Sequence, residues 1–75
     1  MKYIITEKGP FVFSSNILHA EAATKEKVIA AGFVAIKEDE VGKKAICYGE
    51  SCSLNIKSRL NVDSLIINKH LGFPS

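Results

Sequence analysis

The chain has 75 residues, of which 47% are hydrophobic and 24% are charged, and only two are prolines. This composition is typical of a globular protein and excludes a disordered or low-complexity chain. Its length supports one core, so we expect a single domain over residues 1–75, and its net charge of +2 is too small to indicate a nucleic-acid binder by itself.

The first half of the sequence predicts a hairpin, a helix and a strand. β-forming residues at Lys2–Thr6 and Phe11–Phe13 flank a Lys-Gly-Pro turn signal. Good helix formers then extend from Ile17 to about Lys27. The amphipathicity of this helix is weak, so we expect it to lie on the surface of a sheet. β-type residues return from Val28 to Ile36.

The second half predicts two more strands and a final helix. The charged run 37–44 is typical of a loop, and Ala45–Gly49 and Ser51–Ser58 are typical of strands separated near Gly49 by a bulge or tight turn. A helix should follow over Val62–Leu71, with Asn61 as its cap and Gly72 and Pro74 as stop signals.

These elements together predict the fold class. Their order is strand, strand, helix, strand, strand, strand, helix. We expect an α+β fold with a curved, largely antiparallel sheet or small open barrel of about five strands, accompanied by two helices.

The predicted strand Ser51–Ser58 offers a candidate binding surface. Its residues alternate, with Cys52, Leu54 and Ile56 on one face. The opposite face is polar and basic, and such side chains can contact phosphate oxygens or an acidic protein patch. Two interpretations stay open for it: a nucleic-acid interface, or a strand face that is merely solvated. The residues of this basic strand face are Ser53, Asn55, Lys57 and Arg59, and Lys43 and Lys44 could extend it.

The last helix carries apolar residues on two sides. One stripe contains Val62, Leu65, Ile66 and Phe73, and Leu60, Ile67 and Leu71 lie roughly opposite. Two stripes require two partners, so we predict that the second one is an interface with another copy of the chain or another protein. The alternative is that Leu71 belongs to an unwound end and that Ile67 is a tolerated exposed apolar residue.

The segment Ser51–Ser53 concentrates hydroxyls and a thiol, but catalysis would require a base such as His19 or His70 beside it. Short serine-rich strands usually carry solvated hydroxyls, so we predict no enzyme. Cys47 and Cys52 are types of residue that zinc prefers, yet their spacing does not fit a zinc knuckle. We interpret them as free thiols and expect neither a metal nor a cofactor.

Several runs of this sequence are distinctive, and together they span most of the chain. They are Phe13–Ser15, Ile17–His19, Ala31–Val34, Cys47–Arg59 and Asp63–Ser64. They resemble a group of small bacterial proteins, many of them carried by prophages, that have no assigned activity. The resemblance implies a phage or mobile-element context, in which small proteins often bind host or phage macromolecules.

The sequence also bears on location and partners. Residues Met1–Glu7 lack the apolar core of a signal peptide, and no apolar run approaches the ~20 residues that span a bilayer. We therefore expect a cytoplasmic protein without a membrane partner. We predict a non-enzymatic protein-interaction module, with nucleic-acid binding as the alternative.

Overall fold

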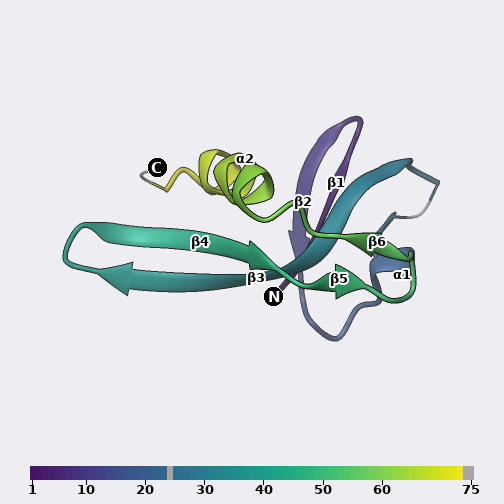
Figure 1. Cartoon of the computed structure of the whole chain (residues 1–75), viewed down its shortest axis with the longest axis horizontal. Helices are drawn as coiled ribbons and strands as arrows, with labels where there is room; N and C mark the ends of the chain where they lie inside the picture. Colours follow the sequence, from purple (N-terminus) through teal and green to yellow (C-terminus); the bar gives the residue numbers. More distant parts are fainter. Residues whose placement is uncertain (24, 74–75) are drawn as a thin grey trace.

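The computed structural model describes residues 1–23 and 25–73, and these form an α+β fold, as predicted (Figure 1). The described elements are six strands and two helices. They are β1 (Lys2–Thr6), β2 (Gly9–Phe13), α1 (His19–Ala23), β3 (Val28–Asp39), β4 (Gly42–Tyr48), β5 (Glu50–Ser51), β6 (Ile56–Lys57) and α2 (Asn61–Leu71).

The main sheet has the strand order β2-β1-β3-β4, and all of its pairs are antiparallel. The predicted opening hairpin is confirmed, because β1 pairs with β2 from Lys2↔Phe13 to Thr6↔Gly9. The long strand β3 pairs with β1 in its first half and with β4 in its second half. The largely antiparallel sheet is thus confirmed, and the described strands form one sheet of four and one of two without closing into a barrel.

The charged run 37–44 is not a loop, which corrects the prediction. β3 and β4 continue through it as a two-stranded ribbon that extends to the left in Figure 1. Asp39 Oδ1 shapes the turn between them by accepting hydrogen bonds from the backbone N–H groups of Val41 (2.9 Å) and Gly42 (3.1 Å). Charged side chains are tolerated in these strands because most of the ribbon's residues are exposed.

Each face of the main sheet has its own apolar core, because successive residues of a strand point to opposite faces. One face, here called the α2 face, is built from Tyr3, Ile5, Ala30, Val34, Ala45 and Cys47 and packs against Ile67. The other, the α1 face, contains Ile4, Phe13 and Ala31 and packs against Ala23 and the partly buried Leu54 and Ile56. The sheet is therefore the middle of three layers.

The first helix is shorter than predicted. It covers only His19–Ala23, and the Leu18 N–H donates to Glu21 Oε1 at its start. The predicted position of this helix on the surface of the sheet is confirmed, because Ala23 packs in the core of the α1 face. His19 is buried between the rings of Phe13 and Phe33. Its Nε2 lies 2.7 Å from the carbonyl oxygen of Gly32 and so anchors α1 to β3.

The predicted strand Ser51–Ser58 is instead a small hairpin. Its strands are β5 and β6, with Glu50 opposite Lys57, and residues 52–55 form the turn. Asn55 lies in this turn with a φ of 55°, a conformation that asparagine tolerates better than most residues. The predicted break near Gly49 is confirmed, since Gly49 separates β4 from β5 with a φ of 76°.

The second helix is confirmed, including its end. Gly72 adopts a left-handed conformation, with its N–H donating to the Lys69 carbonyl, while the Phe73 N–H donates to that of Asn68. Its start differs from the prediction, because the cap position is Leu60 and not Asn61. The second stop signal, Pro74, lies outside the described residues.

Candidate functional site

The structure buries and exposes different apolar residues of α2 than the sequence predicted. Ile67, predicted at an interface, is fully buried in the core of the α2 face, and Leu71 is half-buried against that core. The prediction that Ile67 lies at an interface is therefore wrong, and so is the alternative that it is a tolerated exposed residue. The cause is that the polar residues Asp63 and Asn68 are also buried on the inner side of α2. The positions of apolar residues alone would place both of them in solvent.

Three apolar side chains at the start of α2 are more than half exposed and are here called the α2 ridge. They are Leu60 at 58%, Val62 at 51% and Leu65 at 63%. Leu60 belongs to the predicted interface, whereas Val62 and Leu65 were expected in the core. Clustered exposed apolar side chains are typical of interaction surfaces, whereas single ones need no explanation.

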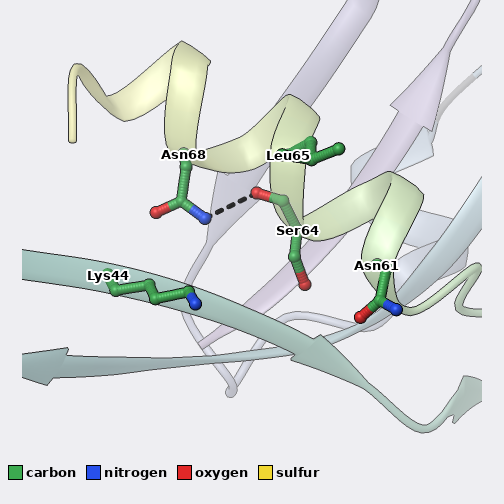
Figure 2. A pocket seen from close by; sticks show the side chains of 5 residues that line it. All are labelled: Lys44, Asn61, Ser64, Leu65 and Asn68. Atoms are coloured by element: carbon green, nitrogen blue, oxygen red, sulfur yellow. Dashed lines mark hydrogen bonds between the residues drawn. The ribbon is translucent and has the colours of Figure 1, made fainter. Parts of the chain in front are cut away.

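A groove of about 250 Å³ lies beside the ridge, between α2 and β4. Figure 2 shows its lining, with Asn61, Ser64, Leu65 and Asn68 contributed by the helix and Lys44 by the strand. Leu65 belongs to both ridge and groove. The groove therefore combines an apolar wall, amide and hydroxyl groups, and one basic side chain.

Two side chains of α2 fix the groove by pairing with the edge of β4. Asn68 Oδ1 accepts a hydrogen bond from the Ala45 N–H (2.7 Å), and its Nδ2 donates to the Ala45 carbonyl (2.8 Å). Ser64 Oγ accepts from the Cys47 N–H (2.9 Å). These bonds occupy backbone groups at the edge of β4 that could otherwise pair with a further strand. The helix α2 therefore blocks this part of the sheet edge against strand pairing.

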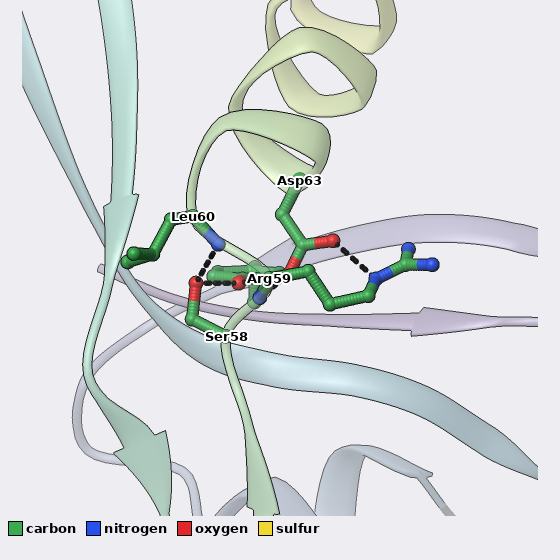
Figure 3. Close-up of polar contacts among 5 residues, drawn as sticks. Ser58, Arg59, Leu60 and Asp63 are labelled. Atoms are coloured by element: carbon green, nitrogen blue, oxygen red, sulfur yellow. Dashed lines mark hydrogen bonds and ion pairs between the residues drawn. The ribbon is translucent and has the colours of Figure 1, made fainter.

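A buried polar network holds the start of α2 and the ridge in place (Figure 3). Asp63 is fully buried, and its Oδ2 accepts hydrogen bonds from the Tyr3 hydroxyl (2.6 Å) and the Arg59 N–H (2.7 Å). Its Oδ1 accepts from Arg59 Nε at 2.8 Å. One carboxylate thus joins β1, the segment before α2 and α2 itself.

The protons of this network can be assigned from its chemistry. Tyr3 has a single hydroxyl proton, and its oxygen lies 2.6 Å from both Asp63 Oδ2 and Ser58 Oγ. The carboxylate can only accept, so the Tyr3 hydroxyl donates to Asp63, and Ser58 donates to the phenol oxygen. Ser58 Oγ in turn accepts from the Leu60 N–H (3.1 Å). Burial, together with the bond to Asp63, raises the pKa of Tyr3 far above its ordinary value.

Leu60 is held in a strained backbone conformation. Its φ of 47° and ψ of −107° lie outside the regions that L-residues with a side chain populate. Such a residue costs on the order of 1–3 kcal/mol and persists only where its surroundings fix it. Here the Leu60 N–H donates to Ser58 Oγ, and the N–H of the preceding residue, Arg59, donates to Asp63 Oδ2.

Replacing Leu60 with glycine should stabilise the protein by about 1 kcal/mol. Glycine removes the strain, and the gain exceeds the ~0.5–1 kcal/mol that its extra freedom in the unfolded chain costs. Thermal unfolding should show a rise of about 4–8 °C. Leu60→Ala is the matched control, because alanine removes the apolar side chain but keeps the Cβ and the strain. Equal stability of the two variants would contradict the strained conformation.

The predicted basic strand face is dispersed by the hairpin. Arg59 is engaged with Asp63, and Lys57 lies opposite Glu50. Ser53 Oγ accepts from the Ala20 N–H at 3.4 Å, so this hydroxyl helps to hold the start of α1. Asn55 occupies the turn and is exposed. These four residues therefore do not form one continuous strand surface.

The other chemical candidates have local partners. Ser51 is buried, and its Oγ accepts from the Leu54 N–H and lies 3.3 Å from Ser53 Oγ. Cys47 is a free buried thiol whose pKa is raised by burial, and Cys52 is free and exposed. Within residues 1–23 and 25–73, no three His, Cys, Asp or Glu side chains cluster as metal ligands would.

Comparison with known proteins gives no assignment: no family model, curated protein or solved structure matches the chain. The resemblance to prophage-borne proteins therefore stays a prediction. Neither of the helices in the described part of the chain is long and apolar enough to cross a membrane.

Proposed function

We propose that this protein is a non-catalytic interaction module that binds an acidic, amphipathic segment of another protein on the α2 ridge and groove. The observation that carries the proposal is the ridge itself. Leu60, Val62 and Leu65 expose more than half of their surface next to a groove that can receive a side chain. Burying such clustered side chains is a main source of affinity in protein interfaces.

The charge of the surroundings favours an acidic partner. Asp63 is the sole acidic residue of α2, and it is fully buried and paired with Arg59. The basic residues of the helix, Lys69 and His70, are exposed, and Lys44 lies in the groove. Opposite charges across an interface steer encounter and exclude wrong partners, so a segment that combines leucine-like residues with Asp or Glu fits this surface.

A rigid support argues for a preformed site. The ridge begins at Leu60, whose N–H donates to Ser58 and whose neighbour Arg59 donates to Asp63. The groove is fixed by Asn68 and Ser64 against β4. A surface that is already ordered loses less conformational entropy when it binds.

The test uses two helical peptides that both carry leucine on one side. On the other side, one peptide carries glutamate and the other carries lysine. We expect the glutamate peptide to bind more tightly, and Leu65→Asp to weaken it by about tenfold or more. Val41→Asp is the control, because Val41 is exposed in the ribbon turn and away from α2. Equal binding of both peptides, or equal effects of both variants, contradicts the proposal. Concentration-dependent sedimentation of the protein alone would instead point to a second copy as the occupant.

A further inference from the structure

A second surface lies on the α1 face of the β3–β4 ribbon, and Lys44, in the edge strand β4, borders both this face and the groove. Its residues follow from the register, in which Phe33 lies opposite Tyr48, Ala35 opposite Ile46, and Lys37 opposite Lys44. Residues that are directly opposite in an antiparallel pair share a face. One end of this ribbon face is therefore aromatic and the other is basic.

The aromatic end is fixed but accessible. The ring of Tyr48 stacks on that of Phe33 with centroids 5.8 Å apart and an interplanar angle of 25°. Phe33 is in turn packed edge-on against the buried His19. Tyr48 nevertheless remains 48% exposed. A ring that is held by a second ring and is about half exposed can serve as a platform for stacking.

The basic end carries a pair of like charges that take part in no ion pair among the described residues. Like charges directly opposite each other destabilise a strand pair, and Lys37 and Lys44 are such a pair. In the described part of the chain the ion pairs are Lys8–Glu26 and Arg59–Asp63, so neither ribbon lysine takes part in one. Asp39 follows on the same face, but its Oδ1 is bonded to the turn. An anion between the two lysines would offset their repulsion.

We propose that this ribbon face binds single-stranded nucleic acid, with a base stacked on Tyr48 and phosphates on Lys37 and Lys44. Single-strand binders combine these two features, an aromatic platform for bases and basic residues along the backbone. Tyr48 and Lys44 are four residues apart, which is about 13 Å along a strand, a span that an extended strand of a few nucleotides covers. The aromatic platform favours this ligand over an acidic peptide, which offers charge without a base.

The experiment measures binding of the intact protein to a labelled oligothymidine at low salt. Two phosphate contacts predict a slope of about −1.4 for log affinity against log salt concentration, and Lys37→Gln should reduce its magnitude by about 0.7. Tyr48→Ala should weaken binding roughly tenfold, whereas Tyr48→Phe, which keeps the ring, should leave it nearly unchanged. Lys37 lies outside the α2 groove, so its effect is independent of that site.

Lys43→Gln is the matched control for charge. Lys43 is the neighbour of Lys44 on the opposite face of the ribbon, where it lies across from Glu38. It should have little effect on binding. Equal losses of affinity for Lys43→Gln and Lys37→Gln would indicate diffuse electrostatic attraction and would overturn the proposed site. No binding at low salt, or polyglutamate binding as tightly as the oligonucleotide, would overturn the proposed ligand.

Discussion

Replacing Asp63 with alanine is expected to destabilise the fold by about 3–5 kcal/mol. The change leaves the buried Tyr3 hydroxyl without its acceptor and removes both Arg59 contacts. Removing one partner of a buried charged network typically has this cost, because the remaining polar groups stay desolvated. A domain of this size has a total stability of only about 4–11 kcal/mol, so the variant should be partly unfolded at 37 °C.

Urea unfolding of Asp63→Ala and Tyr3→Phe side by side measures this effect. Tyr3→Phe removes one hydroxyl from the network and leaves the carboxylate with the Arg59 N–H and Nε, so its cost should be about 1–2 kcal/mol. A cost below 1 kcal/mol for Asp63→Ala would show that the network does not hold α2 to the sheet.

Gly32→Ala is the second substitution with a large expected effect. A Cβ at this position would lie 2.5 Å from the backbone oxygen of Tyr48 and 3.1 Å from Ser58 Cβ. Backbone cannot move aside as a flexible side chain can, so β3 or the end of β4 must shift. We expect a loss of about 2–3 kcal/mol, the upper part of the range for overpacked sites.

The control for this prediction is Gly72→Ala. Gly72 has open space around it, so only its left-handed φ of 74° opposes a side chain, at a cost of about 1–2 kcal/mol. Gly72→Asn should recover part of that loss, because asparagine tolerates this conformation. Thermal unfolding compares the three variants. A loss for Gly32→Ala no larger than for Gly72→Ala would contradict the close approach at Gly32.

Local signals in the sequence predicted most of the elements. The Lys-Gly-Pro turn marks the opening hairpin, Gly49 marks a strand break, and Gly72 ends α2. The run 37–44 was predicted as a loop because its charges resemble those of a solvated connection. In a ribbon that projects beyond the core, however, charged residues also occupy strands, and only the pairing of β3 with β4 distinguishes the two cases.

The candidate site was less predictable, because its geometry depends on polar residues that face inward. Asp63 and Asn68 are polar residues of types usually found on the surface. Each is buried beside a hydrogen-bond partner that is distant in sequence, Tyr3 for Asp63 and Ala45 for Asn68. Their positions turn Ile67 inward and Leu65 outward. The available signal was the spacing of Asp63 and Ile67, since residues four positions apart lie on one side of a helix. For His19 the burying rings come from β2 and β3, which no local pattern indicates.

The most direct test of the proposed interaction surface is a map of backbone amide NMR shifts during titration with the leucine–glutamate peptide. We expect changes concentrated at Leu60, at residues 61–69 of α2 and at Lys44, with the α1 and β5–β6 amides unaffected. Saturable changes centred on α1 or the β5–β6 hairpin, or none at all, would contradict the assignment of the α2 ridge and groove as the binding site.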